Sequence, residues 1–291
     1  MPLVLSVEAW VTALDSAALH AVTDLMRWLG GEERLFLNWA FRLAVDTHTL
    51  KLGVPVLLAF WVWVRPSGYA ADPVRALRKV AGILLAMAIG RGAQIVLPDR
   101  LGPMQATPDF PFPDLGHLPY IDDGSSMPSD HAALAFSLAA VVWIGSRRLG
   151  AVAFLWAAVG VCLPRLYFGY HHLSDLIAGA AIGVLAVRFA LWVPLPSGGV
   201  LSIVRAARRM DARAPGLATV GLFLVAFECL TLFESSRKMG SAAALVAVTA
   251  FAGEQTDAQT ATAASALAAL ASGPEADAAG CGIDTTGSSA R

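Results

Sequence analysis

PSDHAALAFSLAAVVWIGSRRLGAVAFLWAAVGVCLPRLYFGYHHLSD, residues 128–175, contains the pattern from which the architecture follows. Polar clusters at its two ends, Pro128–His131 and Arg165–Asp175, enclose the apolar runs Ala132–Gly145 and Leu149–Pro164, which a pair of arginines separates. Each run, with its flanks, approaches the ~20 residues that cross a hydrocarbon core as a helix. Because one run leads away and the next returns, we expect the two clusters to meet at one membrane face.

The composition of the whole chain indicates an integral membrane protein. Of its 291 residues, 56% are hydrophobic and only 15% are charged, and the mean hydropathy is +0.61, which is too apolar for an ordinary soluble domain. The net charge of -1, with no basic patch interleaved with aromatics, gives no reason to expect a nucleic-acid partner. Three scattered cysteines, Cys162, Cys229 and Cys281, form neither a disulfide framework nor a metal set.

Apolar segments on both sides of this stretch complete an all-α fold, a polytopic membrane helix bundle of about six transmembrane helices. The additional spans are Leu52–Val64, with Lys51 able to snorkel outward, Val80–Pro98, Leu176–Leu195 and Ala214–Phe233. The segment Ser241–Gly253 is too short to count as a span.

This pattern predicts four regions along the chain. Residues 1–50 form amphipathic helices at the interface or against the bundle. Residues 51–195 are the core bundle, and 196–253 hold one or more additional transmembrane helices. Residues 254–291, rich in Ala, Thr, Ser and Gly, form a disordered tail.

The distribution of charge predicts the orientation. Basic residues gather in the connections after the first, third and fifth spans, whereas the loop after the second span is acidic. The positive-inside rule places the basic connections in the cytoplasm and both polar clusters on the extracytoplasmic side. Arg237 and Lys238 run against this rule, so a seventh element or another topology for the carboxyl-terminal part stays open.

The residue types in the clusters suit phosphoryl transfer, which needs an in-line nucleophile, stabilised phosphoryl oxygens and a protonated leaving group. His171 can be the nucleophile, and Asp175, four residues later, can accept a hydrogen bond from its other ring nitrogen. His131 can protonate the leaving oxygen and then activate water. These three are the catalytic candidates.

Cations and a helix start next to these residues suit an anionic group. Arg165 and Arg100 can hold phosphoryl oxygens through charge-assisted hydrogen bonds. Ser129 adds a hydroxyl at the start of the third span, where backbone N–H groups face the same anion. A metal site made by His171, His172 and Asp175 is the alternative, but Arg165 suits an anion better than a cation. We therefore expect neither a metal nor a cofactor.

Two motifs carry a resemblance to a known family. Arg165, His171 and Asp175, with five and three residues between them, resemble the third motif of the type 2 phosphatidic acid phosphatase superfamily. Pro128-Ser-Asp-His131 is similar to its second motif, in the Asp form often found in bacterial members that resemble undecaprenyl-diphosphate phosphatases. The resemblance covers about residues 75–190.

The sequence departs from this family pattern at two places. Gly102 stands before Pro103 where the first motif has an arginine, and Pro164 stands where a serine usually precedes the third-motif arginine. As remnants of the first motif, Arg100 and Arg91 are carried over as phosphate-binding candidates.

The resemblance implies a metal-independent lipid phosphatase that works through a phosphohistidine, in the bacterial inner membrane with its site facing the periplasm. The implied partners are the membrane and a lipid phosphate, with undecaprenyl diphosphate first and phosphatidic acid or phosphatidylglycerol phosphate next. A lipid phosphotransferase and a non-catalytic lipid-binding or transport-like protein are the alternatives. The sequence does not set the oligomeric state.

Overall fold

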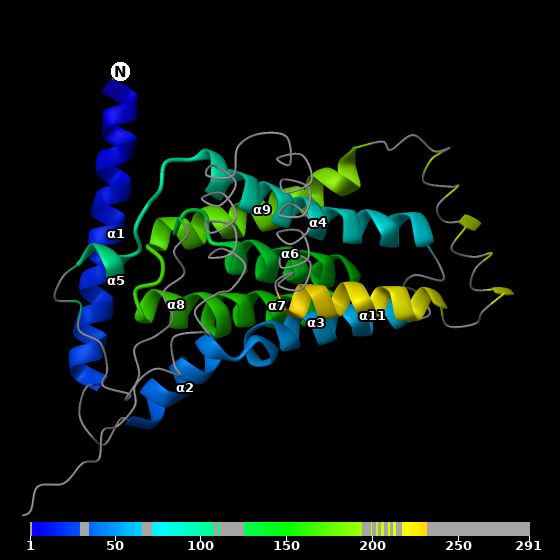
Figure 1. The fold of residues 1–291 in the computed structure, drawn as a ribbon, viewed down its shortest axis with the longest axis horizontal. Helices are drawn as coiled ribbons and strands as arrows, with labels where there is room; N and C mark the ends of the chain where they lie inside the picture. Colours follow the sequence, from blue (N-terminus) through cyan, green and yellow to red (C-terminus); the bar gives the residue numbers. More distant parts are fainter. Residues whose placement is uncertain are drawn as a thin grey trace, which may run out of the picture. The chain divides into compact units, whose positions relative to one another are not determined.

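Helices are the only regular elements in the part of the chain that the structure, a computed structural model, describes (Figure 1). The described residues are 2–29, 35–65, 72–107, 110, 125–193 and 217–231, with isolated positions between 199 and 213. The predicted all-α class is confirmed for these residues. The predicted disordered tail and the segment Ser241–Gly253 lie outside them.

The first half of the chain supplies five helices among the described residues: α1 (Pro2–Leu29), α2 (Leu35–Asp46), α3 (His48–Val64), α4 (Pro73–Val96) and the short α5 (Pro103–Ala106). The start of α4 is well specified, because Asp72 accepts a hydrogen bond from the Arg75 N–H at 2.9 Å and Pro73 occupies the first helical position. The helix therefore begins seven residues before the predicted span.

The second half contains α6 (Asp130–Gly145), α7 (Arg147–Trp156), the π-helical segment η2 (Ala157–Cys162), α8 (Leu163–Tyr167), α9 (Leu173–Trp192) and α11 (Leu217–Leu230). Together α7, η2 and α8 form one helix, Arg147–Tyr167. A π-helical turn of this kind is frequent next to functional sites, and here it lies directly before the chain reaches Arg165.

The central element is α6, which packs against α3, α4, α7 and α9 (Figure 1). Most of its own residues from Asp130 to Val142 are buried, as expected for a helix that is apolar all round. On α9, Gly179 and Gly183 face the carbonyl groups of Ser129 and Ala133, so closely that a methyl group on either glycine would overlap those oxygens. This close approach fixes the start of α9 beside the start of α6.

Three helices are long and apolar enough to cross a membrane among the described residues: Pro73–Val96, Arg147–Tyr167 and Leu173–Trp192. Leu50–Val64 and α6 are apolar but shorter, and α11 has 14 residues. The prediction of about six spans is therefore not confirmed. α6 has 16 residues, and its first turn carries Asp130 and His131 of the Pro128–His131 cluster.

Candidate active site

Both predicted polar clusters lie at the same end of α6 and α9. The Ser129 N–H donates to the Asp175 carbonyl at 3.1 Å, and the His171 Nδ1 atom lies 2.8 Å from the Ser126 carbonyl oxygen. These two hydrogen bonds join the segment before α6 to the turn between α8 and α9. The structure thus brings together residues that the sequence separates by more than 40 positions.

The turn between α8 and α9 presents His171 to this cluster. Gly169 adopts a φ of +68°, a left-handed conformation that glycine tolerates best. Its carbonyl accepts a hydrogen bond from the Met104 N–H at 2.9 Å, while a side chain at Gly169 would collide with Phe110. The chain can therefore reverse within a few residues and place His171 just before α9.

The hydrogen bond to Ser126 defines the tautomer of His171. A carbonyl oxygen only accepts, so Nδ1 carries the hydrogen and the lone pair of the neutral ring lies on Nε2. We expected Asp175 to be the partner of this ring, and that prediction is wrong. The reason is local: Asp175 is the third residue of α9, and its Oδ2 atom turns back to accept from the His172 N–H at 2.8 Å.

Burial and the charge of Arg165 lower the pKa of His171. The carboxylates Asp130 and Asp175 and the hydrogen bond that Nδ1–H donates to the Ser126 carbonyl oppose this shift but do not cancel it. Around neutral pH the His171 ring is therefore uncharged, which is the state a nucleophilic imidazole needs.

His131 is held by its neighbour Asp130. The Oδ1 atom of Asp130 lies 2.7 Å from the His131 backbone nitrogen and 2.8 Å from its Nδ1 atom. Arg91 approaches the other oxygen of Asp130 at 3.7 Å and also donates to Gln94, whose amide donates to the Pro128 carbonyl at 2.8 Å. Burial and the charge of Arg165 lower the pKa of His131, and the carboxylate on Nδ1 opposes this shift. The negative charge of a bound anion would favour the protonated ring that a proton donor needs.

Arg165 is a buried cation, with only 4% of its surface exposed. Its Nη1 atom donates to the Val161 carbonyl at 3.2 Å, and no carboxylate lies within ion-pair distance of it among the residues that the structure describes. Its charge acts on both His131 and His171. Because burying a charge without a counter-ion is costly, this position indicates a site for an anion.

Arg100, a predicted phosphate ligand, binds carboxylates instead. Its Nη1 atom lies 2.6 Å from Asp175 Oδ1 and 2.8 Å from Ser174 Oγ, and its Nη2 atom lies 2.6 Å from Asp15 Oδ2. Asp15 comes from α1 and also accepts from the Ser174 N–H and hydroxyl groups, at 2.8 and 2.7 Å. Arg100 therefore joins α1 to the start of α9.

The pKa of Asp15 reflects this network. Burial raises it, but the hydrogen bonds from Ser174 and Arg100 outweigh burial, so that the pKa lies below its ordinary value. Asp15 is thus a structural carboxylate of the site that sequence reasoning missed. The position of Asp15 in a helical pattern of the sequence did not indicate this role, because its partners lie up to 159 residues away.

Lys51 is a second residue that sequence reasoning missed. We expected it to snorkel outward, but it is only 4% exposed. Its Nζ atom donates to the Val45 carbonyl at 2.9 Å and its charge acts on His131. The Lys51 carbonyl accepts from Trp156 Nε1 at 3.1 Å, which holds α3 against the helix that leads to Arg165. Its role could have been suspected from the sequence, because an ionisable residue such as Lys51 near the start of an apolar helix often has a function.

The departure from the first motif has a steric explanation. A methyl group on Gly102 would lie 2.5 Å from the Tyr170 carbonyl oxygen and 3.1 Å from that of Gly169. The arginine of the family pattern therefore does not fit at Gly102 without moving the turn that carries His171.

The remaining candidate, Ser129, also lies at this end of the bundle. Ser129 is fully buried as the N-cap of α6, where its hydroxyl accepts from the Ala132 N–H at 3.4 Å. Within the described part of the chain, no three His, Cys, Asp or Glu side chains are grouped so that they could hold a metal ion.

Most of the candidate site lies in a part of the chain that matches a known protein family. Residues 79–197 match the model of the PAP2 superfamily, the superfamily that the two motifs resemble. A curated relative, the bacitracin transport permease protein BcrC of Bacillus licheniformis, is 33% identical over 82 residues, which are 28% of this chain and 39% of that protein. The chain thus spans well under half the length of this relative. No solved structure matches the chain.

Proposed function

We propose that this protein, whose residues 79–197 match the model of the PAP2 superfamily, is a membrane-embedded lipid phosphatase that hydrolyses a phosphate ester or diphosphate. Undecaprenyl diphosphate is the leading substrate, followed by phosphatidic acid or phosphatidylglycerol phosphate. The reaction takes place at the extracytoplasmic face of a bacterial inner membrane and needs no metal.

The observation that carries this proposal is the buried guanidinium of Arg165, whose charge acts on two imidazoles. Both His131 and His171 feel its charge, and it has no carboxylate partner among the described residues. A bound phosphoryl group would supply the missing negative charge and accept hydrogen bonds from the free edge of the guanidinium. The start of α6 beside it, capped by Ser129, adds N–H groups that favour the same anion.

His171 is the nucleophile in this proposal. Its Nδ1–H is held by Ser126, so the Nε2 lone pair attacks phosphorus. The N–P bond forms while the bond from phosphorus to the leaving oxygen breaks. The product of this step is a phosphohistidine and a lipid alcohol or lipid monophosphate.

His131 transfers the proton in both steps, first as a general acid and then as a general base. In the first step its Nε2–H passes to the leaving oxygen, while Asp130 stabilises the charged ring. In the second step the neutral ring takes a proton from water, the oxygen of that water bonds to phosphorus, and the N–P bond breaks to release phosphate. His131 ends protonated, ready for another turnover.

Several charged residues act as positioning residues. Asp175, fully buried, holds the start of α9 through His172 and Arg100. Arg91 supports Asp130 from the other side. Lys51 adds a positive charge that can balance a diphosphate, which carries more negative charge than a monophosphate.

The test is release of inorganic phosphate from a short-chain lipid diphosphate by purified protein with chelator present. His171→Ala should abolish release. The neighbouring His172→Gln is the matched control and should retain most of it; the Nε2 atom of His172 lies 3.2 Å from the Leu101 carbonyl oxygen. Alkaline quenching with labelled substrate should trap a base-stable, acid-labile phosphoprotein in the wild type and none in His171→Ala.

The outcomes separate the alternatives. Release that persists in His171→Ala would defeat the nucleophile assignment, and release lost on adding chelator would revive a metal mechanism. Label that passes to an added alcohol instead of water would indicate a phosphotransferase. Lipid binding without any turnover would favour the non-catalytic alternative.

A further inference from the structure

A second cationic region lies at the opposite end of the bundle from the candidate active site. It is formed by the first turns of α4 and the last turns of α9, and Arg78 Nη1 joins them by donating to the Leu191 carbonyl at 3.3 Å. Thirteen residues separate Arg188 from Asp175 along α9, which at 1.5 Å per residue is about 20 Å. This region is therefore separate from the phosphate site.

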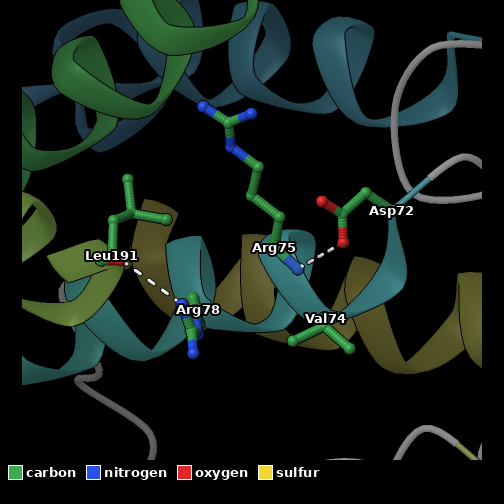
Figure 2. A pocket seen from close by; sticks show the side chains of 5 residues that line it. All are labelled: Asp72, Val74, Arg75, Arg78 and Leu191. Carbon is green, nitrogen blue, oxygen red and sulfur yellow. Dashed lines mark hydrogen bonds between the residues drawn. The ribbon is translucent and has the colours of Figure 1, made fainter. Parts of the chain in front are cut away.

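The cations here outnumber the carboxylates. Arg75, Arg78, Lys79 and Arg188 carry four positive charges against the single carboxylate of Asp72, which leaves +3 among these residues. Asp72 accepts from the backbone N–H of Arg75 at 2.9 Å (Figure 2). No carboxylate lies within ion-pair distance of the Arg75, Arg78 or Arg188 side chains in the described part of the chain, and Arg78 Nε is buried without a hydrogen-bond partner there.

An apolar groove runs from this charge cluster along the bundle. Its volume is about 540 Å³, and both Arg75 and Arg188 line it. The apolar walls come from α6, α7 and α9 and include Trp143, Phe154, Val184 and Trp192. A smaller cavity of about 330 Å³ beside Arg75 and Arg78, shown in Figure 2, adjoins it through Arg75 and Leu191. The groove thus has a cationic mouth and a hydrocarbon-like interior.

We infer that this groove, lined by Arg75 and Arg188, binds an anionic phospholipid. The phosphate of the headgroup lies at the two arginines, and an acyl chain fills the space beside Trp143 and Val184. Basic pockets between transmembrane helices bind anionic headgroups in this way. The exposed Trp192 suits the level of the headgroups. The lipid acts as a bound structural partner and is not hydrolysed, because both catalytic imidazoles lie at the other end.

The test measures lipid binding to the purified full-length protein by native mass spectrometry. Phosphatidylglycerol should bind at one tight site, and phosphatidylcholine with the same acyl chains should bind at least tenfold more weakly. Soluble glycerol phosphate should not compete, since it lacks the acyl chain. The double variant Arg75→Gln, Arg188→Gln should weaken phosphatidylglycerol binding about tenfold or more.

The matched control is the double variant Arg147→Gln, Arg148→Gln. It removes the same charge at the same end of the bundle from exposed side chains that do not line the groove, and it should bind phosphatidylglycerol as the wild type does. Val184→Trp, which fills the apolar wall, should weaken binding without changing any charge. Thermal unfolding of each variant shows that it is folded.

Equal weakening in both double variants would overturn the inference, because surface charge alone would then explain binding. Equal affinity for phosphatidylcholine, or competition by glycerol phosphate, would also overturn it. These outcomes do not depend on phosphate release, so a failure of the proposed phosphatase activity would be seen separately.

Discussion

Replacing Arg165 with methionine should make the protein more stable and inactive at the same time. The side chain is 4% exposed and has only the Val161 carbonyl as a hydrogen-bond partner among the described residues. Burying an ion without a counter-ion costs several kcal/mol, and an apolar side chain of similar volume avoids this cost. The charge of Asp130 already compensates Arg165 in part, so we expect a net gain of only about 1–2 kcal/mol.

The expected loss of activity is much larger. Arg165 can give a phosphoryl group two charge-assisted hydrogen bonds, each worth about 1.5–3 kcal/mol. Losing about 3–6 kcal/mol of transition-state binding corresponds to a fall in kcat/KM of about 10²- to 10⁴-fold. Wild-type protein should also gain thermal stability with added phosphate or orthovanadate, whereas Arg165→Met should not.

The assay is thermal unfolding in detergent, with and without phosphate, together with phosphate release. A rise of about 1–2 kcal/mol corresponds to a Tm shift of roughly 2–8 °C for a chain of this size. Arg148→Met, which removes an exposed charge, is the control and should change neither Tm nor turnover. A lower Tm for Arg165→Met without ligand, or an equal response of both proteins to phosphate, would refute the reasoning.

Four further predictions concern the surroundings of the site. Lys51→Met should lower kcat/KM for a lipid diphosphate about tenfold and affect a lipid monophosphate less, as a comparison of the two substrates would reveal. Because the pKa of His171 is lowered, its ring stays neutral as the pH falls through about 6.5, the ordinary pKa of histidine. The value of kcat/KM should therefore decline only at lower pH. A decline in kcat/KM centred at or above about pH 6.5 would contradict this. The pKa of Asp15 is lower in the folded protein than its ordinary value, so the contribution of this carboxylate to stability is present above about pH 4. The contribution is lost as the pH falls through the pKa of Asp15 in the folded protein. The Tm difference between wild type and Asp15→Asn should therefore shrink below about pH 4. Gly102→Ala should destabilise by about 1–3 kcal/mol and lower turnover, because the added methyl group collides with the turn that carries His171; unchanged turnover would show that this turn can move freely.

The meeting of the two polar clusters could be predicted from sequence, because two apolar runs of similar length have to return the chain to its starting level. The partner of His171 could not. Spacing of four residues puts side chains on one helical face only where both residues are helical, and His171 lies in the turn before α9 begins at Leu173. The carboxylate of Asp175 is therefore directed to Arg100 and the helix start.

Contacts over long sequence distance account for most of what sequence reasoning missed. Asp15 reaches Ser174 across 159 positions, and only folding brings α1 to the start of α9. Lys51 was misassigned because snorkelling is the usual behaviour of a lysine at a helix end, whereas Trp156 and Val45 hold this one inside the bundle. The prediction of about six spans is not confirmed, because only three of the described helices are long and apolar enough to cross a membrane.

The seam between α6 and α9 restricts the route by which a hydrophobic tail can arrive. Gly179 and Gly183 press so closely against the carbonyl groups of Ser129 and Ala133 that no methylene could slide between these helices. Along α4, by contrast, a methyl group on Gly90 would still lie 3.8 Å from the Ala133 side chain. That distance is ordinary van der Waals contact, so α4 leaves room there for a methyl group and no more. A polyprenyl or acyl chain therefore has to arrive by a route other than the seam between α6 and α9.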